Sequence, residues 1–193
     1  MLLSQDEARF SLIPTLRTTL GIKGYRPLVG NLDCHDYLSL FGALNLDSGR
    51  LTTHVVARPR KRQRPAASKH RHLQAGFATH LRAIARAYPA IDHPRVVVVI
   101  DKAPWHRGAV SNEVRATSRH LEVYPLPSDS PQLQVIERFW KVLRRRATHN
   151  RLFPTMADLM QSLRNNLCYY QTLKHRVLSL IQASKKRTKL AAA

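Results

Sequence analysis

Asp101 is the first residue whose position could support chemistry. It directly follows five apolar β-branched residues, Val96–Ile100, a run that predicts a strand buried on both faces in the middle of a sheet covered by helices. The carboxyl ends of such strands line the crevice in which ligands bind, so a carboxylate there is a candidate for chemistry. Pro104 and Gly108 favour a plain turn-forming aspartate just as strongly, and this stretch alone does not separate the two interpretations.

A second carboxylate, Glu137, lies beside the apolar stripe of a predicted helix. After Pro131, apolar residues recur at spacings of three and four, which predicts a helix packed on the core. The stripe consists of Ile136, Phe139, Trp140 and Leu143. Lys141 and Arg144 follow Glu137 at i+4 and i+7, so one acid heads a basic ridge. An exposed Glu–Lys pair would have the same spacing, and helical geometry does not exclude it.

These segments resemble the catalytic core of mariner-like insertion-sequence transposases (IS six-thirty type), a group of the DDE superfamily related to the retroviral integrases. The likeness consists of D-K-A-P-W-H from Asp101 and S-P-Q-L-Q-V-I-E-R-F-W from Ser130. At the N-terminus, D-E-A-R-F from Asp6 and K-G-Y-R-P from Lys23 also resemble the family. Glu137 follows Asp101 by 36 positions, which is similar to the family's spacing between its second Asp and its Glu.

The resemblance implies an α/β chain with an RNase H-like mixed sheet, in which three antiparallel strands precede parallel strands and helices flank the sheet. It implies that Asp6, Asp101 and Glu137 hold two Mg²⁺ ions, with Mn²⁺ as a substitute, for metal-dependent DNA strand cleavage and strand transfer. The implied partner is double-stranded DNA, both transposon ends and target, with a homodimer as one option. Residues expected to contact DNA are Lys102, His106, Arg138, Lys141, Arg144, Arg145 and Arg146.

The sequence also departs from the family pattern. Lys102 stands where Asn usually follows the second Asp, Gln134-Val135 replaces Asn-Pro, and Leu20 replaces a Trp. No acid of the triad is lost. Two alternatives therefore stay open beside an active transposase domain: a catalytically inactive, basic nucleic-acid-binding remnant of a transposase, and an RNase H-type nuclease.

Charge agrees with a polyanionic partner. The chain of 193 residues carries a formal charge of +20, and such a field favours nucleic acid. Residues 1–57 hold five basic and five acidic residues, whereas residues 58–193 hold 27 basic and seven acidic ones. A ribosomal or histone-like scaffold would show the same bias, so charge alone does not choose the function.

Length and composition predict one folded unit. A chain with 44% hydrophobic residues can bury one good core. We expect a catalytic core over residues 1–150, and C-terminal helices with a basic tail over residues 151–193. The sequence has no signal peptide and no apolar run near the ~20 residues of a membrane span, which predicts a cytoplasmic protein. The family resemblance implies that it is DNA-associated and bacterial. A helix-turn-helix module has no room before the first strand, so we also expect an N-terminally truncated chain.

The elements that must position these acids follow from periodicity. We expect a strand over residues 2–5 that reaches Asp6 and turns back through Ala8 to Ile13, followed by a hairpin of strands over 37–46 and 51–56. Helices are predicted over 68–88 and 107–119, on either side of the strand that ends at Asp101, with a further strand over 121–124. Thr155 begins a helix by a capping box, and a last helix covers about 173–181.

Overall fold

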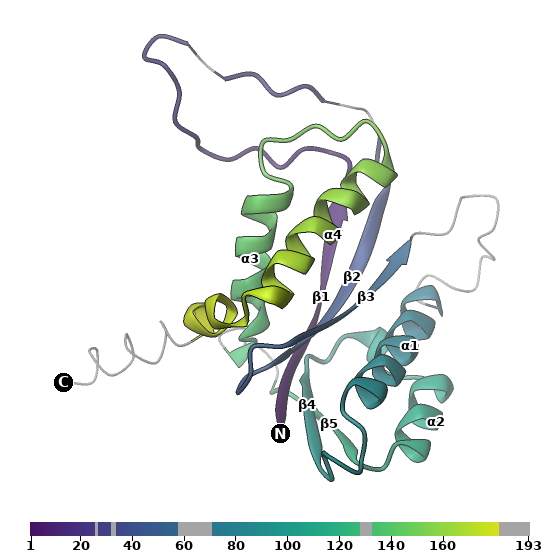
Figure 1. Cartoon of the computed structure of the whole chain (residues 1–193). Coiled ribbons are helices and arrows are strands. Elements are labelled where there is room, and N and C mark those ends of the chain that lie inside the picture. Colours follow the sequence, from purple (N-terminus) through teal and green to yellow (C-terminus); the bar gives the residue numbers. More distant parts are fainter. Residues whose placement is uncertain (26, 32–33, 58–70, 128–132, 182–193) are drawn as a thin grey trace.

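A computed structural model describes residues 1–25, 27–31, 34–57, 71–127 and 133–181. A mixed sheet of five strands forms its centre, in the order β3-β2-β1-β4-β5 (Figure 1). The strands are β1 (Leu2–Ser11), β2 (Tyr37–Asn45), β3 (Leu51–Ala57), β4 (Val96–Ile100) and β5 (Leu121–Pro125). The first three are antiparallel, and β4 and β5 run parallel to β1, as predicted.

Helices lie on both faces of this sheet (Figure 1). The helices are α1 (Arg71–Ala87), α2 (Ala109–Thr117), α3 (Ile136–Ala147) and α4 (Met156–Thr172), with a short 3-10 helix η2 (Pro104–His106) and a last helix over 174–181. The capping box of Thr155 with Asp158 is present at the start of α4. Helix α3 begins at Ile136, five residues after the predicted start at Pro131.

The two helical layers enclose separate clusters of buried side chains. On one face α3 and α4 pack on β1 and β2 through residues such as Phe10, Leu40 and Leu143. On the other face α1 and α2 pack on β4 and β2 through residues such as Phe77 and Val98. We call these the α3 face and the α1 face.

Strand β1 corrects one prediction. It runs unbroken from Leu2 to Ser11 and pairs with β2 along almost its whole length, so Asp6 lies in the middle of a strand and the chain does not turn there. The reason is that Ala8 and Phe10 continue the buried pattern on the α3 face, which keeps the chain extended.

Strand β4 corrects another prediction. Val96, Val98 and Ile100 are buried on the α1 face, whereas Val97 and Val99 are only partly buried. The helices of the α3 face contact β1 and β2 and leave this part of β4 uncovered within the described residues. The strand is therefore fully buried on one face only.

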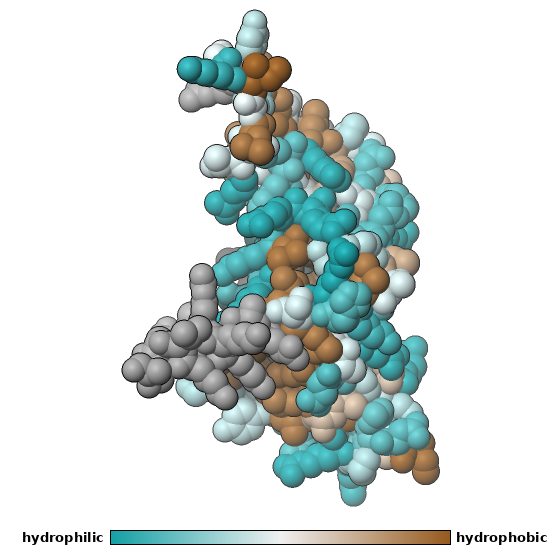
Figure 2. Space-filling model, turned by 60° about the vertical axis from the view of Figure 1, so that its left-hand side comes forward, coloured by the Kyte–Doolittle hydropathy of each residue, from teal (hydrophilic) through white to brown (hydrophobic). Residues whose placement is uncertain are grey.

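The connection between β1 and β2 projects from the sheet as an arm (Figure 1). Its base is fixed where Thr15 forms a bridge with His149. Further out, Leu20, Ile22 and Leu28 are 78% to 100% exposed, and apolar side chains are visible on the arm at the top of Figure 2. No helix in the described ranges is long and apolar enough to cross a membrane.

Candidate active site

Strand register brings Asp6 and Asp101 together. Strand β4 pairs in parallel with β1 through Ser4 and Val99, and the same register continued by two residues sets Asp101 opposite Asp6. Side chains alternate along a strand, so Asp6 shares the α3 face with Ala8 and Phe10. Because β4 ends at Ile100, the two carboxylates lie where β1 continues past the end of β4 and remains paired only with β2.

Glu137 completes the group from the first turn of α3. A buried amide docks this end of the helix: Gln134 donates from Nε2 to the backbone oxygen of Gln5 at 3.0 Å. Ser4 donates to Gln134 Oε1 at 3.3 Å, and its hydroxyl also accepts from the backbone N–H of Ile136 at 3.4 Å. The start of α3 is thereby attached to the strand that carries Asp6.

A glycine sets how closely α3 approaches that strand. Gly42 of β2 pairs with Asp6 of β1, and the Trp140 ring occupies the space beside it. A Cβ at Gly42 would lie 2.5 Å from the Trp140 ring and 3.3 Å from Ile136 Cδ1. The missing side chain therefore lets the helix that bears Glu137 settle against β1 and β2.

The three acids interact in the folded chain. The pKa of Asp6 is raised from 3.8 to about 6, chiefly by burial and also by the charges of Asp101 and Glu137, while the backbone N–H of Glu7 opposes the rise. The indole N–H of Trp140 has no partner in hydrogen-bonding geometry among the described residues, yet its dipole lies close enough to lower this pKa. Asp6 is thus held in a site that penalises its negative charge.

Asp101 has the opposite environment. Burial would raise its pKa, but hydrogen bonds from His106 and from the Ala103 N–H outweigh burial and hold the pKa below its ordinary value. His106 Nδ1 lies 3.0 Å from Asp101 Oδ1 and 3.1 Å from its backbone oxygen. Both are acceptors, so Nδ1 carries the proton. The His106 side chain is 4% exposed and that of Asp101 45%, so His106 orients a carboxylate that stays accessible.

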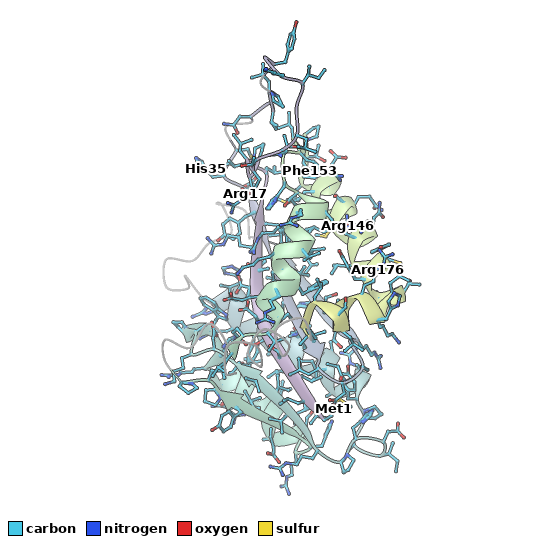
Figure 3. The ribbon with its side chains drawn as sticks, turned by 90° about the vertical axis from the view of Figure 1, so that its left-hand side faces the viewer. Met1, Arg17, His35, Arg146, Phe153 and Arg176 are labelled. Carbon is cyan, nitrogen blue, oxygen red and sulfur yellow. The ribbon has the colours of Figure 1, made fainter. Side chains whose placement is uncertain are left out.

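The predicted DNA contacts on α3 divide between two sides of the helix. With about 3.6 residues per turn, Lys141 and Arg144 share the side that carries Glu137. Arg146, which is labelled in Figure 3, lies on the opposite side. Its guanidinium carbon lies 4.3 Å from the ring centre of Tyr169 of α4. Arg138 donates to the backbone oxygen of Ile181 at 3.4 Å.

Three further residues were predicted to contact DNA: Lys102, His106 and Arg145. Lys102 follows Asp101 and is exposed, and Arg145 is an exposed residue of α3. His106 lies behind Asp101 and packs on the ring of Phe77, with ring centroids 4.4 Å apart. The structure therefore gathers Lys102, Lys141 and Arg144 near the acids and sets Arg146 apart.

The three acids do not form a closed metal site by themselves. No three His, Cys, Asp or Glu side chains of the described ranges are gathered closely enough to hold a metal ion. Mg²⁺, however, usually binds through one or two carboxylates, waters and substrate phosphate oxygens rather than in a protein cage. The accessible carboxylate of Asp101, beside the partly buried Asp6 and with Glu137 nearby, fits that requirement.

Sequence reasoning missed the residues that hold the acids in place. Gln134, Ser4 and Gly42 were not predicted as site residues. Gln134 stood out only as a departure from the family's Asn, and that departure is the one available signal. No local sequence pattern identifies the partner of a single glycine or serine in a strand. Trp140 follows Gly42 by 98 positions, and Ile136 follows Ser4 by 132.

Comparisons with known proteins identify the family and the fold of the chain. Residues 1–160 match the family described as DDE superfamily endonuclease. The fold is similar to the Mos1 mariner transposase in a paired-end complex with Mn (TM-score 0.67, 15% identity, 96% of this chain and 53% of that chain). It is also similar to a pre-cleavage Mos1 transpososome (TM-score 0.62, 13% identity, 94% and 54%).

The catalytic domain of Mos1 mariner transposase is another match (TM-score 0.57, 14% identity, 94% of this chain and 78% of that chain). The chain thus spans about half the length of the Mos1 chains in the complexes. These likenesses confirm the predicted RNase H-like fold. No curated protein matches the sequence.

Proposed function

The chain belongs to the DDE superfamily endonucleases, and from that premise we propose that it is the catalytic domain of a transposase, which cleaves and joins DNA strands. The observation that carries this proposal is the strand register that sets Asp101 opposite Asp6, in a place where the charges of Asp101 and Glu137 raise the pKa of Asp6. Carboxylates that repel one another in the free protein form a site that a cation or a polar substrate can relieve.

Each acid has a distinct role in this proposal. Asp6 and Asp101 hold divalent metal from adjacent strands, and Glu137 completes the ligand set from α3. A pair of Mg²⁺ ions, with Mn²⁺ as a substitute, would activate the attacking oxygen and stabilise the leaving oxygen of the phosphodiester. His106 keeps Asp101 ionised and oriented through Nδ1, so that its exposed oxygen faces the reaction site.

Basic residues near the acids suit the DNA backbone. Lys141 and Arg144 continue the side of α3 that starts at Glu137, and Lys102 follows Asp101. Such contacts to phosphate position a duplex without reading its sequence. We propose double-stranded DNA as substrate, as transposon ends and as target, for a protein that works on DNA in the bacterial cytoplasm.

We also propose that two copies act together. The Mos1 comparisons include paired-end complexes, and the arm of this chain exposes Leu20, Ile22 and Leu28, which a second copy could cover. Replacing these three residues with serine should shift a DNA-bound dimer to monomer in light scattering. A dimer that persists would place the contact elsewhere.

Nicking of supercoiled plasmid separates the proposed function from its alternatives. We expect conversion to open circles with Mg²⁺ or Mn²⁺ and none with EDTA. DNA binding without metal-dependent nicking would favour the inactive remnant, and cleavage confined to RNA–DNA hybrids would favour an RNase H-type nuclease.

A further inference from the structure

A basic cluster lies on the side of α3 opposite Glu137. The guanidinium carbon of Arg146 lies 4.3 Å from the ring centre of Tyr169, and that of Arg176 lies 5.5 Å from the same centre. Arg176 also donates from Nη1 to the Tyr169 hydroxyl oxygen. Figure 3 shows both arginines beside α4 and the helix over 174–181. We call Arg146, Tyr169 and Arg176 the Tyr169 cluster.

Packing fixes the helix that carries Arg176. Val177, the next residue, is completely buried among the side chains of the α3 face. On the other side, Gly49 of the turn between β2 and β3 approaches the backbone of this helix, since a Cβ there would lie 2.6 Å from the Lys174 oxygen. Arg176 is therefore held beside Tyr169 by a docked helix.

No acid balances the charge of the Tyr169 cluster. Among the described residues, neither guanidinium group forms an ion pair with a carboxylate, and both arginines are exposed. Residues 159–193 contain seven Lys and Arg but no Asp or Glu. Two cations beside one ring repel each other, so a bound anion would relieve a cost that the free protein carries.

The donors of the Tyr169 cluster suit a phosphate group. A planar guanidinium can donate two N–H bonds to phosphate oxygens, and its stacking on a ring keeps that plane oriented. The Tyr169 hydroxyl accepts from Arg176, which leaves its own proton for a phosphate oxygen. Contacts of this kind hold a nucleic-acid backbone without reading its sequence.

Exposed bases of α3 lie between the acids and this cluster. At about 100° per residue, Lys141 is turned about 40° from Glu137 around the helix axis. Arg145 is turned about 80° and Arg146 about 180°, and all three basic residues are exposed. The axial rise from Glu137 to Arg146 is about 13 Å, over which a B-form duplex advances by about four base pairs. Basic side chains thus follow the exposed half of α3 from one edge to the other.

We propose that the Tyr169 cluster binds the phosphate backbone of the duplex that reacts at the acids, so that the DNA crosses α3 obliquely toward α4 and the helix over 174–181. This inference rests on the proposed function and adds a binding site for DNA to it. Tyr169 and Arg176 lie beyond residues 1–160, which match the endonuclease family, so the family match gives them no role. The C-terminal helices then belong to the DNA-binding surface as well as to the fold.

Salt dependence of duplex DNA binding tests the contact. Each phosphate neutralised contributes about 0.9 to the slope of log affinity against log salt. Arg146→Ala/Arg176→Ala should lower that slope by at least about 0.9 and weaken binding at least about tenfold, as expected when charged hydrogen bonds are lost. Arg82→Ala/Arg86→Ala removes two exposed arginines of α1 and is the matched control for net charge, which should change neither quantity. Equal losses in the two double variants would overturn the proposal.

Chemical modification tests the path on the unaltered protein. A duplex of about 20 base pairs, roughly 70 Å long, is added at one duplex per chain, and arginines are modified with phenylglyoxal. Mass spectrometry should show Arg145, Arg146 and Arg176 protected together, whereas Arg82 stays reactive. Protection of Arg145 without Arg146 and Arg176 would mean that the duplex does not cross to α4, and would overturn the proposal.

Plasmid nicking supplies a third measurement. Loss of a contact remote from the reacting phosphate removes binding that the ground state and transition state share, so Arg146→Ala/Arg176→Ala should raise KM at least about tenfold and leave kcat unchanged. A fall in kcat with KM unchanged would mean that the Tyr169 cluster acts on the acids through the fold, and would overturn the proposal. Absence of nicking by the unaltered protein would instead refute the proposed function, and the two binding measurements would still decide this inference.

Discussion

The two faces of β1 treat polar side chains in opposite ways. On the α3 face, Asp6 is only partly buried and lies within range of two further carboxylates. On the α1 face, Gln5 and His80 are completely buried, and neither side chain has a hydrogen-bond partner among the described residues. Burial, followed by repulsion from His54 and His106, lowers the pKa of His80 to about 3, so this buried imidazole is neutral at pH 7.

The two faces differ in whether their buried or partly buried polar side chains carry charge. A neutral imidazole between a helix and a sheet can be tolerated as part of a core, stacked here on Phe41 at 5.9 Å. Three carboxylates that repel one another do not stabilise packing. They lie instead on the α3 face, where Asp101 is exposed to solvent. We therefore propose that the α1 face supports the fold and that the α3 face carries the chemistry.

Removal of single charges on the α3 face should have the largest effect. Asp6→Asn, Asp101→Asn and Glu137→Gln keep the shape of each side chain but remove one metal-binding charge. We expect each to lower Mg²⁺-dependent plasmid nicking more than about 100-fold, since even groups that only support a metal ligand contribute about 10- to 100-fold. Asp36→Asn is the control and should stay active. Full activity of Asp6→Asn together with loss in Asp36→Asn would refute the assignment of the first acid.

The pH dependence of stability should differ in sign between the faces. Asp6 has a folded pKa of about 6 and an ordinary value of 3.8, so the unfolded chain loses this proton first as pH rises. The free energy of unfolding should then fall between pH 4 and 6, by at most about 3 kcal/mol, because part of the carboxylate stays solvated. In EDTA, Asp6→Asn should remove this loss and be more stable than the unaltered protein at pH 7 but not at pH 4.

His80 should instead lower the stability of the protein at acidic pH. Its folded pKa lies below its ordinary value of 6.5, so stability is fully present above pH 6.5 and falls as pH drops toward 3. His80→Phe keeps an aromatic ring against Phe41 and should flatten this acid limb in urea titrations, without changing the alkaline side. An unchanged acid limb would mean that His80 is protonated in the folded chain.

The sequence predicted the secondary structure and the acidic residues of the α3 face. It did not predict which distant residues contact them. Hydrophobic periodicity predicted the strands and helices, and family likeness pointed to Asp6, Asp101 and Glu137. The strand register that sets Asp101 beside Asp6 and the amide of Gln134 that docks α3 depend on contacts between distant residues.

Two glycines permit a matched test of packing on the faces. A Cβ at Gly42 would lie 2.5 Å from Trp140 on the α3 face, and a Cβ at Gly76 would lie 2.4 Å from Val56 on the α1 face. Overpacking of this kind typically costs about 1–3 kcal/mol, although Gly76→Ala regains up to about 1 kcal/mol of helix propensity. Both variants should melt earlier, but only Gly42→Ala should lose nicking activity well below its melting temperature, since it displaces the helix that carries Glu137. Equal loss of activity in both would show that the α1 face also controls the acids.

The smallest effect expected concerns single exposed bases. Lys141 lies on the side of α3 that carries Glu137, whereas Arg82 is an exposed residue of α1 on the other side of the sheet. If duplex DNA follows the α3 face, Lys141→Ala should lower the slope of log affinity against log salt by about 0.9, the contribution of one phosphate. Arg82→Ala removes the same charge from the protein and should leave the slope unchanged, so net charge is controlled. Binding measured by fluorescence anisotropy at several salt concentrations gives both slopes. Equal changes in the two variants would mean that DNA binds without preference for either face. That result would refute the α3 face as the DNA-binding surface but would not bear on the catalytic role of the three acids.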